Sequence, residues 1–316
     1  RDHGTACVSC HTALPYALAR PSLRQALGER TRPTGEQQMM DNVTRRVRLW
    51  RDVEPFYPDQ KHGLPKTSES RGTEAVLNAL ILATRDADTG VLSVDGQRAF
   101  ANVWALQMQT GDLQGAWSWL NFGLEPWEAS ASPFFGAALA AIAVGTASEG
   151  YASTESAAPK VELLRAYVQK EVESQSLFNR LMALWASGKL PGLLSQAQRE
   201  AIVTAASAAQ SADGGWSMPS LAPWGRIGDS ILSGTSDGFA TALTLLAMQQ
   251  AGGPHTAHSM TSLEKGRAWL IANQDSRTGS WPASSINKES DPNSDRGKLM
   301  SDAATAYAAR FLAGGG

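Results

Sequence analysis

Apolar side chains recur along this chain at the three- and four-residue spacing of amphipathic helices, and clusters of Gly, Pro and Ser interrupt them. Alternating runs of β-branched residues, which would predict strands, are nearly absent. The pattern therefore predicts an all-α protein. The expected helices lie near residues 36–51, 70–86, 95–110, 133–145, 159–187 (two helices), 194–210, 236–251, 262–274 and 301–313.

Polar residues that suit helix N-termini stand at or near the start of several of these stretches. Thr34 is followed by Gln37, and Ser195 is followed by Gln198, the spacing of a capping box. Ser262 and Ser301 are the expected caps of the last two helices.

Two sorts of helix alternate along the chain. One is polar on one side, as in residues 264–271, and the other is small and apolar on most faces, as in residues 239–248 and 303–313. A helix that is apolar nearly all round must be covered on every side. We therefore expect an inner ring of small-residue helices inside an outer ring of amphipathic ones.

An internal repeat supports this arrangement. Residues 210–217 (QSADGGWS) are followed by a linker and an inner helix that begins SDGFATA, and residues 274–282 (QDSRTGSWP) are followed by SDAATA. Gln109, Gly115 and Trp117 form a looser earlier copy. Each unit contains an outer helix, a Gln…Trp turn, a connection and an inner helix, so residues 36–316 predict about five helical hairpins.

These turns resemble the glutamine–tryptophan repeats of the squalene–hopene cyclase and prenyltransferase toroid families. Gln210 with Trp216 and Gln274 with Trp281 match well, and the resemblance covers roughly residues 95–316. It implies an αα-toroid in which each Gln caps a helix end and stacks on the Trp. Class II cyclases of that family protonate their substrate with the middle Asp of an Asp-x-Asp-Asp motif, which this chain lacks. The resemblance therefore implies the fold and not the activity.

Four charged residues stand near the expected starts of inner helices. Asp237 and Asp302 occupy equivalent positions of the repeat, and Arg71 and Glu74 fall in the corresponding turn of the first inner helix. Each Asp is either an N-terminal cap or, together with Arg71 and Glu74, part of a polar ring at the mouth of a central cavity.

The segment Cys7-Val8-Ser9-Cys10-His11 predicts covalent attachment of one haem c. Cys7 and Cys10 would each form a thioether to a haem vinyl group, and His11 would be the proximal iron ligand. The chain contains two cysteines, both in this motif. A disulfide, a redox Cys-x-x-Cys and half of a zinc site are the alternatives. However, no second Cys/His pair and no βαβ pattern accompany the motif.

Attachment of haem c takes place outside the cytoplasm, so this interpretation predicts a periplasmic or extracytoplasmic protein whose signal peptide has been removed. Pro15, Pro21 and Pro33 follow the motif, and we expect residues before 34 to surround the cofactor with little regular structure. The predicted organisation is a haem-binding segment with the first outer helix at 1–66 and the toroid at 67–316.

The sequence does not single out one residue as the sixth iron ligand. His62, in a loop between the first two helices, and Met39 or Met40, at the start of the first helix, are the leading candidates. His3, His255, His258, the other methionines and an open coordination position are the alternatives. A Met ligand would raise the reduction potential, whereas a second His would lower it.

Charge and hydropathy narrow the function classes further. A net charge of −2 with 18% charged residues does not indicate a protein that binds nucleic acid. Residues 1–66 nevertheless hold more Lys and Arg than Asp and Glu, which would suit haem propionates or an acidic partner; a solvated helix face is the alternative for Arg45, Arg46 and Arg48. No apolar run approaches the ~18–20 residues of a membrane span.

The sequence thus predicts a monohaem cytochrome that transfers one electron. Its partners would be a redox protein or another cytochrome, with the toroid as scaffold or docking surface in a larger assembly. A haem-dependent oxidoreductase or degenerate cyclase, and a lipid- or protein-binding module with structural haem, are the rival interpretations; whether the chain is an enzyme is open.

Overall fold

The computed structural model describes residues 4–148, 150–225, 227, 231–252, 256–291 and 293–314. Within these ranges the chain forms helices and loops, with a single isolated β-bridge between Leu124 and Glu128. The all-α prediction is confirmed. No helix in this part of the chain is both long and apolar enough to cross a membrane.

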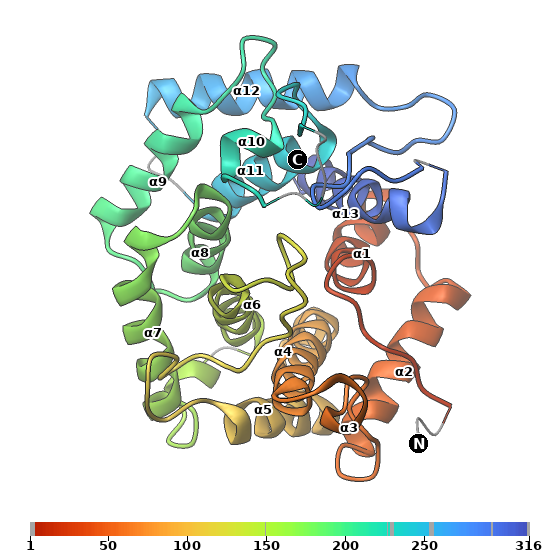
Figure 1. Ribbon diagram of the computed structural model, residues 1–316, viewed down its shortest axis with the longest axis vertical. Coiled ribbons are helices and arrows are strands. Elements are labelled where there is room, and N and C mark those ends of the chain that lie inside the picture. Colours follow the sequence, from red (N-terminus) through yellow and green to blue (C-terminus); the bar gives the residue numbers. More distant parts are fainter. Residues whose placement is uncertain are drawn as a thin grey trace.

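Six helices are packed against one another in a closed order, α1–α4–α6–α8–α11–α13, and α13 packs against α1 again (Figure 1). Arg310 of α13 joins the ends of this order by donating a hydrogen bond to the carbonyl of Leu18 in α1, at 2.9 Å. The six inner helices are α1 (Ala13–Leu27), α4 (Lys66–Asp86), α6 (Ser132–Thr146), α8 (Leu177–Lys189), α11 (Gly238–Gln250) and α13 (Asp295–Ala313).

Amphipathic helices pack on the outside of this ring, and each precedes an inner helix in the sequence (Figure 1). They are α2 (Thr34–Arg48), α5 (Val94–Leu106), α7 (Ala158–Glu171), α9 (Gln196–Ala208) and α12 (Ala257–Ala272). Two short helices, α3 (Asp59–His62) and α10 (Met218–Leu221), lie in the connections. The repeat predicted that each outer helix pairs with the inner helix that follows it, but α5, α7, α9 and α12 pack chiefly against the inner helix that precedes them, and only α2 packs against the one that follows.

Large aromatic side chains fill the space between the inner helices. The rings of Phe178 and Phe239 stack at 6.4 Å, and Tyr307 lies 5.9 Å from Phe239. Trp185 of α8 meets Tyr307 of α13 edge to face at 5.9 Å, although α11 separates these two helices in the ring. Contacts between aromatic side chains therefore cross the interior and hold the inner helices together.

The helix α1 contradicts the expectation of little regular structure before residue 34. The prolines suggested an irregular segment, but the helix tolerates both. Pro15 lies in the first turn, where a backbone N–H has no helical partner, and the helix continues through Pro21. Leu14, Ala17 and Leu18 are buried at helical spacing against the ring. The predicted boundary at residue 66 therefore separates helices that pack against each other. Helices α1 and α2, before it, both contact α4, which begins there.

Helix N-termini correct several of the expected starts. The capping box of Ser195 and Gln198 is confirmed. By contrast, α12 is capped by Thr256 and α13 by Ser294, so Ser262 and Ser301 lie inside their helices. Thr34 is likewise the first residue of α2, after Pro33.

The Gln…Trp turns share one hydrogen-bonding scheme. The indole N–H groups of Trp117, Trp216 and Trp281 donate to carbonyls in the last turns of α5, α9 and α12, at 2.8, 2.7 and 2.8 Å. The side-chain amide of Gln210 donates to Gly214 and to Ser262 of the next outer helix, both at 2.8 Å.

In the earlier copy of the repeat, Gln107 and not Gln109 is the equivalent residue. The Gln107 amide donates to Gly115 at 3.1 Å and to Lys160 of α7 at 2.9 Å, whereas Gln109 donates to the Gln107 carbonyl. A longer turn shifted the glutamine, so the sequence spacing alone misassigned it.

Candidate functional site

The Cys7–His11 motif leads directly into the inner helix α1. The Ser9 hydroxyl accepts hydrogen bonds from the backbone N–H groups of Thr12 and Ala13 at 3.2 and 3.0 Å, and the Ser9 carbonyl accepts one from Leu14 at 3.0 Å. These bonds satisfy donors that the first turn of a helix leaves free. They also fix the backbone that carries Cys10 and His11.

Residues before the motif are held by α2. The Asn42 side chain pairs with both backbone groups of Ala6, at 2.6 and 2.8 Å. Arg46 donates to the Thr5 hydroxyl at 2.8 Å and forms a two-point ion pair with Glu74 of α4, with Nη2–Oε2 at 2.9 Å. Arg46 is thus fully buried, which contradicts its placement on a solvated face.

Both cysteines are free, and their surroundings favour the protonated thiols. Cys7 reaches the surface, but surrounding protein atoms shield its sulfur, and together with the Glu74 carboxylate they raise the pKa of Cys7 to about 12. Burial, followed by the charge of Glu128, raises the pKa of Cys10 well above its usual value. Zinc sites and thiol exchange need the thiolate form, which these surroundings disfavour.

The imidazole of His11 is presented in its neutral form. Burial lowers its pKa, and a hydrogen bond of 2.8 Å joins Nδ1 to the Thr12 hydroxyl. Its ring lies 5.8 Å from that of Trp127, between centroids. A neutral imidazole whose Nδ1 is engaged in a hydrogen bond leaves Nε2 available as a metal ligand.

His11 lines a cavity of about 300 Å³ at one end of the inner ring. The connection between α5 and α6, which crosses the middle of the ring in Figure 1, supplies one wall through Trp127 and Glu128. Residues 285–288 and the first turns of α13 supply the others. Asn287 joins two walls by pairing with both backbone groups of Glu125, at 2.8 and 2.6 Å.

The groups that line this cavity suit parts of a haem, but a volume of about 300 Å³ is smaller than the whole group. The volume lies at the lower end of the range for small-molecule and cofactor sites, and the cavity wall is mainly apolar. Lys288 and Arg296 line the same cavity and would suit the propionates. Neither thiol lines it, but Glu128 does, and its charge acts on both Cys7 and Cys10. The thiols and His11 therefore share one neighbourhood.

The predicted distal ligands lie away from this cavity. His62 is exposed on α3 and packs against the edge of the Tyr57 ring at 5.2 Å. Met39 and Met40 lie on the outer helix α2, where Met40 is buried in the core. His3 and His255 lie outside the described residues. Met300, which the sequence analysis included only among the other methionines, lines the cavity together with His11.

The four charged residues near the inner-helix starts take different positions. Arg71 donates to the carbonyls of Trp50 and Val53, and the nearby Glu74 pairs with Arg46. Asp237 caps α11, accepting from the N–H groups of Phe239 and Ala240 at 2.9 and 3.0 Å.

Asp302 is exposed in the second turn of α13, with Lys298 and Asp295 as charged neighbours. Asp237 thus takes the capping position. The structure brings Arg71 and Glu74 together, and no interaction among its described contacts joins that pair to Asp237 or Asp302.

Most of the expected basic surface is engaged within the molecule. The N-terminal cations that form ion pairs are Arg20, Arg24, Arg32, Arg46, Arg48 and Lys66. Glu36 alone, which is 1% exposed, is paired with three of them. These ion pairs stabilise the packing of α1 and α2. They also reduce the positive charge that the surface offers to an acidic partner.

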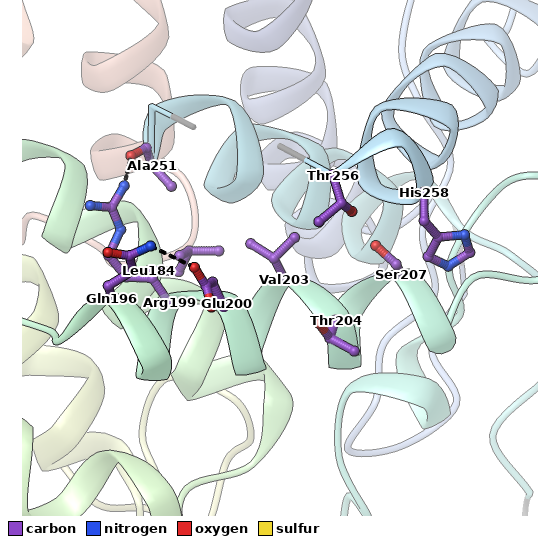
Figure 2. A pocket seen from close by; sticks show the side chains of 10 residues that line it. All are labelled: Leu184, Gln196, Arg199, Glu200, Val203, Thr204, Ser207, Ala251, Thr256 and His258. Atoms are coloured by element: carbon purple, nitrogen blue, oxygen red, sulfur yellow. Dashed lines mark hydrogen bonds between the residues drawn. The ribbon is translucent and has the colours of Figure 1, made fainter. Parts of the chain in front are cut away.

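A second cavity, of about 490 Å³, lies between α9 and α12 (Figure 2). Gln196 and Glu200 are hydrogen-bonded at 2.8 Å on one side, and His258 stands on the other (Figure 2). The Ser207 hydroxyl has no hydrogen-bond partner there. His258, one of the alternative iron ligands, lines this cavity, but no residue of the Cys7–His11 motif does.

Comparison with known proteins does not assign the chain to a family, because neither a protein-family model nor a curated protein matches it. Within the described residues, no cluster of three or more His, Cys, Asp or Glu could hold a metal ion by itself. The interpretation therefore rests on the motif and on the cavity beside it.

Proposed function

We propose that this chain is an extracytoplasmic c-type cytochrome that carries one covalent haem and transfers single electrons to a redox partner protein. The observation that carries the proposal is that neutral His11, held by Thr12, faces a largely apolar cavity whose wall includes the neighbour shared by the two cysteine thiols. A bound haem would supply reversible one-electron exchange at its iron.

The cysteines would attach the haem as thiols. Each S–H would add across one vinyl C=C bond: sulfur bonds to one carbon, the hydrogen goes to the other, and no oxidant is consumed. The raised pKa values keep that proton on both sulfurs at neutral pH. His11 would bind and orient the iron from the proximal side, and Trp127 would exclude water from it.

We further propose that the helices form an αα-toroid of the squalene-cyclase and prenyltransferase type. The closed contact order of six inner helices supports this, as does the repeated bond from a Trp indole to the preceding outer helix. The toroid would be a rigid scaffold for the haem and a docking surface within a redox assembly.

Little in the interior favours cyclase chemistry. Asp237, the best-placed carboxylate, accepts three backbone hydrogen bonds, from Met218, Phe239 and Ala240. Both oxygens of Asp237 are thus engaged by backbone N–H groups, although burial outweighs these bonds and raises its pKa to about 6. Aromatic rings also pack against one another between the inner helices: Phe178 stacks on Phe239, and Tyr307 is tilted against Phe239.

A redox titration followed by absorption spectroscopy tests this function. The purified holoprotein should be low-spin, reduce reversibly in one one-electron step and fail to bind carbon monoxide or cyanide. A high-spin haem that binds these ligands would instead support the haem oxidoreductase.

A further inference from the structure

We propose that the cavity between α9 and α12 binds a small neutral molecule with an aliphatic body and a hydroxyl or carbonyl group, whose oxygen pairs with the Ser207 hydroxyl (Figure 2). This site is independent of the haem motif, because no residue of Cys7–His11 lines it. Its volume of about 490 Å³ lies within the range of small-molecule sites. The inference goes beyond the proposed electron transfer and gives the outer side of the ring a ligand of its own.

The cavity runs along one face of α9. Its lining residues on this helix recur every three and four positions from Gln196 to Ser207, which corresponds to about 16 Å of helix rise. Leu184, which is fully buried on the inner helix α8, lines the cavity together with Val203 and Ala251. The cavity thus extends from the surface between two outer helices to the inner ring. An aliphatic body suits these apolar walls.

The repeat places Ser207 where an earlier outer helix carries a tryptophan. The carbonyls that accept from the turn indoles are those of Val103 in α5 and Ala206 in α9. The residues that follow them, Trp104 and Ser207, therefore hold equivalent positions. The indole of Trp104 donates to the Tyr151 hydroxyl at 2.8 Å, in the groove beside α5. Ser207 does not fill the volume that this indole takes up, which leaves room for a ligand in the groove beside α9.

The Ser207 hydroxyl is the group that points to a ligand. Ser207 is 5% exposed, and its hydroxyl has no hydrogen-bond partner among the residues that the structure describes. In Figure 2 it lies on the side of α9 that faces Thr256 and the start of α12. A buried hydroxyl without a partner is unfavourable, and a ligand oxygen that pairs with it would remove that cost. A hydroxyl can donate or accept, so an alcohol and a ketone both suit it.

The charged side chains of this cavity are already engaged. Arg199 donates to the carbonyl of Ala251, and Glu200 accepts from the Gln196 amide at 2.8 Å. One cation and one anion therefore stand together at this end, which favours a neutral ligand over a carboxylate or an amine. His258, on the other side of the cavity, offers an imidazole to a second polar atom of the ligand (Figure 2).

Binding of 1-octanol to the purified protein tests the site, with octanoate as the charged molecule of the same chain length. We expect octanol to shift the methyl NMR signals of Leu184 and Val203 saturably, and to bind more tightly than octanoate. Ser207→Ala should weaken octanol binding about 3- to 10-fold, as expected for the loss of one hydrogen bond. Ser207→Trp, which places an indole where Trp104 has one, should abolish binding.

Ser187→Ala is the matched control. Ser187 is a buried serine of α8 whose hydroxyl donates to the Leu184 carbonyl at 2.7 Å, and it does not line the cavity. This variant should bind octanol as the parent does. Because Ser207→Ala removes only a hydroxyl, it decides the test even if Ser207→Trp does not fold.

Three results would overturn the inference. The first is no saturable shift at Leu184 and Val203, and the second is an octanol affinity that Ser207→Ala leaves unchanged. The third is tighter binding of octanoate, which would contradict a neutral ligand. None of these measurements depends on haem, so their failure would leave the proposed cytochrome intact. Absence of covalent haem would likewise leave this site intact.

Discussion

The imidazole of His11 lies against the indole of Trp127, with the ring centroids 5.8 Å apart and the planes inclined at 49°. Trp127 is 7% exposed and also meets Phe239 edge to face at 5.6 Å. The histidine of the motif is therefore connected to the aromatic packing inside the ring. Trp127 also lines the cavity beside His11.

We expect Trp127→Ala to lower the midpoint potential while the haem stays covalently attached, because water entering beside the iron stabilises its more charged oxidised form. Potentiometric titration of both proteins measures the shift. Trp104→Ala is the matched control, because Trp104 bonds to Tyr151 on the outer side of the ring and does not line this cavity. Equal potentials in all three proteins would mean that Trp127 does not shield the site.

The buried pair of Arg46 and Glu74 should be critical for stability. Arg46→Met leaves the Glu74 carboxylate buried without its partner and releases Thr5, so we expect a loss of about 3–5 kcal/mol in the free energy of unfolding. The double variant Arg46→Met, Glu74→Leu should recover much of that loss. Urea denaturation measures both; losses that simply add would contradict a coupled pair.

The third Gln…Trp turn gives a test of the repeat. Trp281 is 4% exposed and its indole donates to Leu270, so Trp281→Ala should destabilise the fold by roughly 3–5 kcal/mol. Ile271→Ala, at a side chain that is 61% exposed, should change stability by less than about 0.5 kcal/mol. Thermal and urea unfolding check the pair, and an unchanged melting temperature for Trp281→Ala would refute the assigned turn.

Asp237 should make stability fall as the pH rises. Burial raises the pKa of Asp237 from 3.8 to about 6. Between these values the folded state binds more protons than the unfolded state, so this contribution is complete below pH 3.8 and is lost as the pH rises through about 6. Asp237→Asn keeps a capping side chain and removes the titration.

Free energies of unfolding measured from pH 4 to pH 8 check this expectation. Relative to Asp237→Asn, the parent should lose up to about 3 kcal/mol across that range. Other titrating groups cancel in the difference between the two proteins. Parallel curves would show that Asp237 has an ordinary pKa.

Much of the fold was predictable because helical periodicity is a local property of the sequence. The alternation of amphipathic stretches such as 264–271 with apolar ones such as 239–248 indicated which helices lie outside and which inside. Helix α1 was missed because Pro15 and Pro21 resemble breakers, although the first lies where a helix tolerates it. Gln107 was missed because its turn is longer than the later copies.

The site was predictable only in part, for a related reason. Adjacent residues encode the motif itself, so Cys7, Cys10 and His11 stand out from the sequence. Met300 comes to line a cavity with His11 only when α13 packs against α1, and no local pattern encodes that contact. Arg46 likewise has the spacing of a surface residue until Glu74 and Thr5 provide its buried partners.

The intact mass of the denatured chain tests covalent haem attachment most directly. The chain would be produced behind a cleavable signal in cells that attach haem c. We expect the mass to exceed that of the polypeptide by one haem, and the excess to disappear in the double variant Cys7→Ser, Cys10→Ser. A parent chain with the mass of the bare polypeptide, made in cells that load a control c-type cytochrome, would contradict the proposed cytochrome.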